Sequence, residues 1–201
     1  MALCLLRRQV RQKARHGCMA SSSLSARPDS VVSAASWVLR QQNVILRGIN
    51  KNEYGMKSPP TASSIGGHIR HSLDHFQSLF TGIKENSTIE YDSRERGTDI
   101  ELMPSAAESA IRELQESIDQ LTEEDLKKSI KCAFMVAGDG ATSEFDSNVR
   151  RELFFCTHHA IHHNAFIKVL TLEMGIEEVC PAEMGLAPST ISFMNSSDGN
   201  M

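Results

Sequence analysis

The sequence lacks closely paired cysteines, a long apolar run and any acidic residue before Asp29, and these absences argue against particular classes of protein and site. No apolar stretch approaches the roughly eighteen residues of a membrane-spanning helix, so we expect no membrane segment. The five cysteines are widely spaced without a Cys-x-x-Cys pair, which argues against a disulfide framework and a cysteine-type zinc site. A net charge of -4 gives no reason to expect a nucleic-acid partner.

The first 28 residues hold basic side chains and no acid, whereas the rest of the chain holds 15 basic and 25 acidic residues. An Arg-rich, Ser-rich and acid-free start is typical of a mitochondrial transit peptide. A disordered extension, or Met19 as a second initiator, accounts for it as well. Because the cysteines indicate a reducing compartment, we expect the protein in the cytosol or the mitochondrial matrix.

The composition of the whole 201-residue chain, with 40% hydrophobic and 23% charged residues, is typical of one soluble domain. We place this domain at residues 29–194 and expect 195–201 to be disordered. Apolar residues at helical spacing predict four helices, over about 29–47, 64–83, 104–121 and 148–174.

The third predicted helix opens at Pro104 and carries a Ser105–Glu108 capping box. Residues 85–99 read as a charged, irregular connection, and residues 130–142 as a short hairpin turning at Gly138–Gly140. The tail after Gly175 reads as irregular chain. The sequence thus predicts an all-α four-helix bundle with a small irregular or hairpin insert before the last helix.

Seven of the eight histidines fall in two of these helices. His68, His71 and His75 share one face of the second helix, because their spacing is i, i+3 and i+7. The fourth helix carries two i, i+4 pairs, His158 with His162 and His159 with His163. Two imidazoles one turn apart can chelate one ion while the backbone stays regular.

One second-helix histidine and one fourth-helix pair would give three imidazoles and an open position, as in catalytic zinc sites. Nickel and iron also accept imidazole, so the predicted cofactor is a divalent metal: Zn, Ni or Fe. Spacing alone leaves several triads open. It also leaves open a surface run of histidines that binds metal adventitiously.

At these residues the chain resembles the DinB superfamily of four-helix metalloproteins. Ser64 stands seven residues before His71, as in the family's second helix, and His159 and His163 match its His-x3-His pattern. The sequence departs from the family at 164–166, where Asn-Ala-Phe replaces the common Arg-Gly-Gln. The resemblance covers about residues 30–176. It implies a bundle of DinB type with His71, His159 and His163 as metal ligands.

The resemblance implies a range of activities. Some relatives attach low-molecular-weight thiols to electrophiles in a metal-dependent reaction, and others act on thiol conjugates by hydrolysis or isomerisation. The leading hypothesis is therefore a metal-dependent enzyme, a transferase or hydrolase that activates a thiol or water. The alternative is a non-catalytic metal-binding or structural protein. A small-molecule substrate and a homodimer are the candidate partners.

Further residues are candidates to orient the ligands or to line a pocket. Asp74 and Glu152 can each face the site from a predicted helix, although a solvated surface acid accounts for Glu152 at least as well. Tyr91 and Arg94, with Arg70 nearby, can bind an anionic substrate; the alternative is a solvated charged loop. The remaining candidates are the other clustered histidines: His68, His75, His158 and His162.

Overall fold

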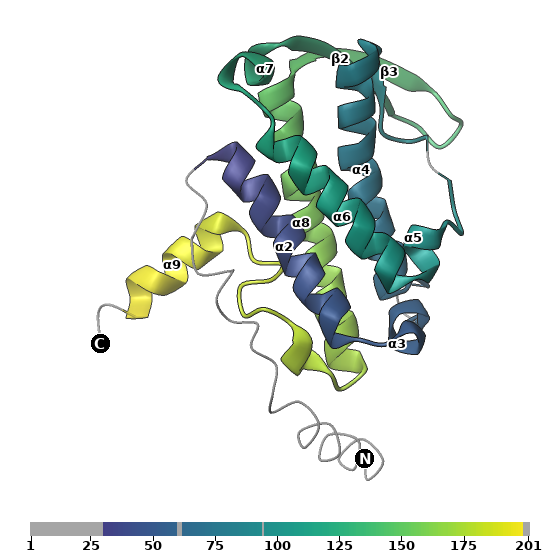
Figure 1. Cartoon of the computed structure of the whole chain (residues 1–201), viewed down its shortest axis with the longest axis vertical. Helices are drawn as coiled ribbons and strands as arrows, with labels where there is room; N and C mark the ends of the chain where they lie inside the picture. The colour runs from purple at the N-terminus through teal and green to yellow at the C-terminus, as the bar shows by residue number, and fades with distance from the viewer. Residues whose placement is uncertain (1–29, 60–61, 94, 199–201) are drawn as a thin grey trace.

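The protein is described here by a computed structural model that covers residues 30–59, 62–93 and 95–198. Four long helices make up most of it (Figure 1): α2 (Val31–Gly48), α4 (Ile65–Glu85), α6 (Pro104–Asp119) and α8 (Val149–Glu173). Helix α4 packs along α8, and α2 packs against both α6 and α8. The predicted segment 1–28 and residues 199–201 lie outside the described residues.

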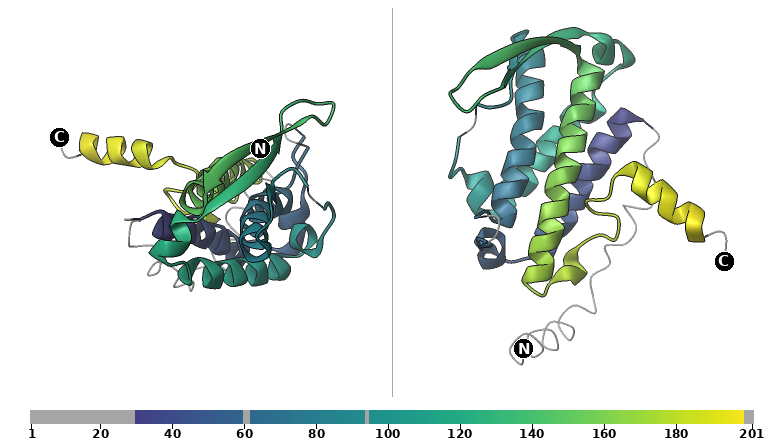
Figure 2. Two further views of the ribbon diagram at one scale, coloured as in Figure 1. Left: turned by 90° about the horizontal axis from the view of Figure 1, so that it is seen from above. Right: turned by 180° about the vertical axis from the view of Figure 1, so that it is seen from behind.

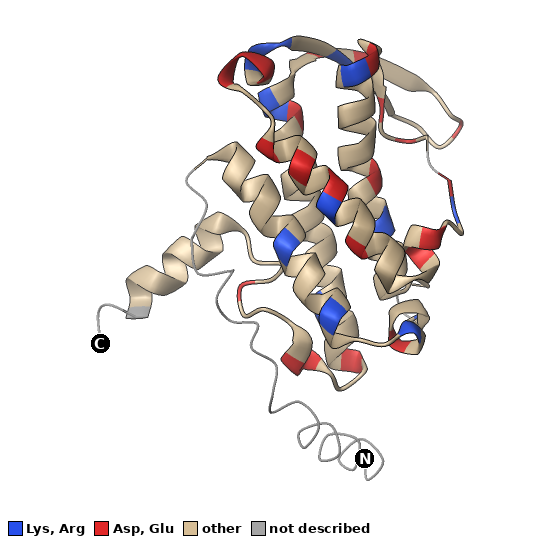
Figure 3. Ribbon diagram, viewed as in Figure 1, with Lys and Arg blue, Asp and Glu red and all other residues tan. Residues whose placement is uncertain are grey.

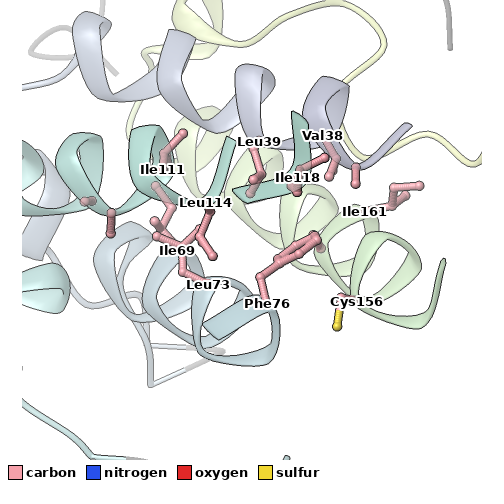
Figure 4. Packing of buried hydrophobic residues seen from close by; sticks show 14 of the residues in the cluster. Val38, Leu39, Ile69, Leu73, Phe76, Ile111, Leu114, Ile118, Cys156 and Ile161 are labelled. Carbon is pink, nitrogen blue, oxygen red and sulfur yellow. The ribbon is translucent and has the colours of Figure 1, made fainter. Parts of the chain in front are cut away.

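The core between these helices is mainly aliphatic (Figure 4). Each long helix directs apolar side chains into it, as helical spacing predicts. Leu39 comes from α2, Leu73 and Phe76 from α4, and Ile111 from α6; all four are fully buried. Helix α8 contributes Cys156 and Ile161. Such burial is the main stabilising term of a fold of this size.

Several short elements connect or follow the long helices: α3 (Lys51–Gly55), α5 (Asp99–Leu102), α7 (Glu123–Lys127), the 3-10 helix η1 (Glu177–Val179) and α9 (Pro188–Asp198). The tail was expected to be irregular, but it ends in α9, which includes residues 195–198 of the predicted disordered end. Figures 1 and 2 show α9 projecting away from the four long helices.

The expectation of an all-α fold was too narrow, because three strands form a small sheet in the order β1-β2-β3. The predicted hairpin is present as β2 (Ser129–Met135) and β3 (Thr142–Asn148), paired antiparallel, and Figure 2 shows it lying across the ends of α4 and α8. Strand β1 (Ile89–Glu90) comes from the connection expected to be irregular and pairs parallel with β2. A two-residue strand has no periodicity to read in sequence; it forms because β2 offers it backbone partners.

Basic and acidic positions are interspersed along the long helices and several connections (Figure 3). This mixed pattern agrees with the small net charge of the chain. Within the part of the chain that the structure describes, no helix is both long and apolar enough to cross a membrane.

Candidate metal centre

The start of α4 is fixed by a cap and by close packing, and this determines which way its histidines face. The Ser64 hydroxyl accepts a hydrogen bond from the Gly67 amide at 3.0 Å, which caps the helix. Gly66 is in contact with a neighbouring segment: a Cβ added there would lie 2.2 Å from the Glu101 carbonyl oxygen. Asn148 caps α8 in the same way, accepting from the Arg151 amide at 3.0 Å.

His71, His159 and His163 converge between α4 and α8. One side-chain nitrogen of each lies within 4.8 Å of the others. The ring centroids are 4.7 Å apart for His71 and His163, 4.6 Å for His159 and His163, and 5.0 Å for His71 and His159. Three imidazole nitrogens this close together could coordinate one divalent ion between them.

The donor set fits a borderline divalent ion, because all three groups are imidazoles that must be neutral to coordinate. Burial, followed by the neighbouring His159 and His71, lowers the pKa of His163 from 6.5 to about 2. His163 is therefore neutral at physiological pH, and a lone pair is available on its ring. His71 and His159 are only partly buried, which leaves an approach to the group from solvent.

His68 lies beside this triad and contacts one member directly. Its Nδ1 is 2.9 Å from the Nδ1 of His163, within hydrogen-bond distance. The His68 ring stacks on Phe166 at a centroid distance of 5.1 Å with an interplanar angle of 10°. Burial and the nearby His162 lower the pKa of His68. The two rings are therefore neutral, and one Nδ1 donates to the other.

His75 supports the triad from the next turn of α4. Its Nδ1 donates a 2.9 Å hydrogen bond to the carbonyl oxygen of His71. Its ring is stacked between His159, at 3.9 Å, and Tyr91, at 5.3 Å. His75 therefore limits how the His159 ring can turn.

His158 and His162 lie on the exposed side of α8. The ring of His158 is near Phe154, at 5.9 Å, and that of His162 is near Phe166, at 4.9 Å. Of the two i, i+4 pairs that sequence spacing left open, His159 and His163 form one group with His71. His158 and His162 are exposed and are not part of that group.

Glu152 is fully buried, so a solvated surface position for it is wrong. Its carboxylate accepts hydrogen bonds from the hydroxyls of Tyr91, at 3.0 Å, and Ser147, at 2.6 Å, and it is paired with Arg151. None of these partners is a histidine. Glu152 therefore joins the sheet to α8 instead of orienting a ligand through a direct contact.

Of the predicted anion-binding group, the structure describes Tyr91 and Arg70, and both have partners within the protein. Tyr91 is buried against Glu152 and His75, and burial raises its pKa well above the usual value. Arg70 is buried and ion-paired with Asp74 and, at 3.0 Å, with Glu101, which places Asp74 beside Arg70 on α4. Arg94, the other candidate, lies outside the described residues.

Two groups near the centre were not predicted from sequence. An aromatic group stands beside His159, in which Phe134 of β2 is 5.4 Å from Phe155 of α8, and Phe155 is 5.9 Å from His159. A buried polar network follows His163: the Gln42 amide donates to Asn164 at 2.9 Å and to Ser72 at 2.7 Å. The Asn-Ala-Phe departure from the family pattern was the sequence signal for the polar network. No local sequence pattern indicated the aromatic group.

Comparisons with known proteins identify the family and the fold of this chain. A family model described as the DinB superfamily matches residues 35–167, about two thirds of the chain. The fold is similar to that of YjoA, a DinB-like protein from Bacillus subtilis solved at 2.30 Å, with a TM-score of 0.55 and 24% identity; the match covers 78% of this chain and 99% of that one. A protein named FK506-binding protein 5 from Rhizopus delemar is 35% identical over 109 residues, which are 54% of this chain and 28% of that protein.

Proposed function

The chain belongs to the DinB superfamily, and we propose that it is a four-helix-bundle metalloenzyme that binds one divalent ion through His71, His159 and His163. The convergence of three imidazoles carries the proposal; among the residues that the structure describes, the group has three members. A three-imidazole set leaves a coordination position for another molecule. When bound, the ion supplies Lewis acidity that lowers the pKa of a thiol or a water to a value useful at neutral pH.

The surrounding residues supply positioning and an apolar boundary. His75 holds the His159 ring by stacking at 3.9 Å. Phe134 and Phe155 form an aromatic wall next to His159, which excludes water from one side of the centre and offers a surface to an apolar substrate group. We propose transfer or hydrolysis with a small-molecule substrate.

One observation favours a second candidate, a non-catalytic metal-binding protein. The ring of His75 lies 3.9 Å from that of His159, and a fourth imidazole at this place can close the open position. In that case the ion would stabilise the junction of α4 and α8 instead of serving a reaction.

Metal analysis of untagged protein tests the site. We expect about one divalent ion per chain, and loss of most of it in both His71→Ala and His163→Ala. His158→Ala is the matched control, because it removes a histidine from the exposed side of the same helix. Unchanged metal content in the two triad variants would contradict the ligand assignment.

Addition of a small thiol to the cobalt-substituted protein then separates the two candidates. A change in the visible spectrum upon addition of 2-mercaptoethanol supports an open position and the enzymatic proposal. A spectrum that no added thiol or anion changes supports the closed, non-catalytic site. In that event His75→Ala should open the position and restore the response.

A further inference from the structure

We propose that His68 is a positioning residue of the metal centre, which holds His163 so that its Nε2 is directed to the ion. The inference rests on the proposed function, since it assumes that His163 is a ligand. In this role His68 accepts a hydrogen bond from His163, carries its own proton on Nε2 and raises the affinity of the site for the metal.

The His68 ring is fixed in place. It stacks on Phe166 at 5.1 Å with an angle of 10° between the planes, and only 8% of the residue is exposed. His68 precedes His71 by three residues on α4, so both side chains lie on the face that packs against α8. The Nδ1 atoms of His68 and His163, 95 positions apart in sequence, are then 2.9 Å from each other.

This contact determines which nitrogen of His163 is available. A nitrogen engaged in the 2.9 Å hydrogen bond has no free lone pair for an ion, so Nε2 is the remaining ligand atom. A coordinating Nε2 must be unprotonated, which places the proton of neutral His163 on Nδ1. His163 therefore donates and His68 accepts, the arrangement in which a second group orients a ligand imidazole and raises its basicity.

The other nitrogen of His68, Nε2, indicates that this histidine does not serve the stability of the fold. As the acceptor at Nδ1, neutral His68 carries its proton on Nε2, and this buried nitrogen has no hydrogen-bond partner among the described residues. An unsatisfied buried donor destabilises the folded state. A phenylalanine at position 68 would keep the stack on Phe166 and leave no such donor.

His68 is also distinct from the ligands. The three nitrogens that lie within 4.8 Å of one another belong to His71, His159 and His163. His68 contacts only the last of them by a hydrogen bond. It therefore acts on the ion through His163.

Two substitutions at position 68 test the inference with Co²⁺ and Zn²⁺ as probes. His68→Phe keeps the ring and removes the acceptor, and we expect a loss of metal affinity of about 10- to 100-fold, the usual range for such orienting groups. His68→Asn places an amide oxygen near the former Nδ1, and we expect it to recover most of the affinity. His158→Phe, on the exposed side of α8, is the matched control and should bind as the wild type does.

Two readouts other than affinity separate positioning from a structural role. The melting temperature of metal-free His68→Phe should equal or exceed that of the wild type, because the unsatisfied Nε2 is gone. Nitrogen-15 NMR of the zinc-loaded wild type should show His163 protonated on Nδ1.

Each result has a definite meaning. Wild-type protein that binds neither Co²⁺ nor Zn²⁺ overturns the proposed function and this inference together. Wild-type binding with unchanged affinity in His68→Phe overturns only the inference. Equal losses in the Phe and Asn variants, together with a lowered melting temperature of both metal-free proteins, would show a structural role and also overturn it.

Discussion

The hydroxyl of Tyr91 donates a 3.0 Å hydrogen bond to the fully buried carboxylate of Glu152, 61 positions later in the chain. Tyr91 directly follows β1, and Glu152 lies in the first turn of α8. The same carboxylate accepts from Ser147 of β3 at 2.6 Å. One buried acid therefore joins strand β3 and the residue after β1 to α8, and Tyr91 in turn stacks on the ring of His75.

Removal of this acid should destabilise the protein more than removal of one of its partners. Glu152→Ala leaves the buried Tyr91 hydroxyl without its acceptor, and we expect the free energy of unfolding to fall by about 3 kcal/mol. Tyr91→Phe removes a single donor, and Glu152 keeps Ser147 and Arg151, so the expected loss is about 1 kcal/mol. Urea unfolding measures both, and equal stabilities of the two variants would contradict the shared role of Glu152.

The metal-free protein should lose stability as the pH falls below about 6.5. His163 is neutral in the folded state because its pKa is lowered to about 2, whereas the unfolded chain takes up this proton near pH 6.5. The contribution of His163 to the free energy of unfolding is thus fully present above pH 6.5 and is lost as the pH falls toward 2. The loss amounts to at most about 1.4 kcal/mol per pH unit.

Urea unfolding of metal-free protein between pH 7.5 and 5 checks this. In the His163→Gln variant, the free energy of unfolding should depend less steeply on pH, by the equivalent of about one proton. An identical pH dependence in wild type and variant would mean that His163 titrates normally in the folded protein.

Gly66→Ala should be strongly destabilising. The added methyl group would lie 2.2 Å from the Glu101 carbonyl oxygen and 2.7 Å from a Tyr54 ring carbon, so α4 and its neighbours must move apart. We expect a loss of about 2–3 kcal/mol. Gly138→Ala is the control, since no atom lies within 4 Å of its added methyl. Thermal unfolding of both variants gives the comparison, and similar melting temperatures would refute the close approach at Gly66.

Asn164 should stabilise the fold through its two glutamine partners. It accepts from Gln42 at 2.9 Å and donates to Gln41 at 3.1 Å, all within buried surroundings. Asn164→Leu removes the donor to the Gln41 side-chain oxygen and one of the two acceptors of the Gln42 amide, which keeps Ser72, and we expect a loss of about 2–3 kcal/mol. The double variant with Gln42→Leu should lose less than the sum of the single variants, as coupled residues do. Strict additivity in chemical unfolding would show that the network carries no coupling.

The helix positions illustrate what local patterns predict well. Helix α8 begins after Asn148 and ends at Glu173, with Gly175 in the left-handed conformation at φ 66°, close to the predicted 148–174. The predicted Ser105–Glu108 capping box is wrong. Helix α6 begins at Pro104 with Met103 as its cap, so Ser105 already lies inside the first turn.

The sequence by itself determined the positions of the four long helices, the hairpin before α8 and the two histidine clusters. Helical periodicity, capping and the i, i+4 spacing of ligands involve only neighbouring residues, so they can be read locally. The family resemblance selected His71, His159 and His163, and the family is confirmed.

Only the tertiary structure decided how those clusters face each other. The rotation of α8 about its axis, which turns His159 and His163 toward α4, depends on packing against other elements, chiefly α4 and α2. The contact of His68 with His163 joins residues 95 positions apart, and the hydrogen bond of Tyr91 to the buried Glu152 joins residues 61 positions apart. Such contacts form between distant segments, and no local pattern encodes them.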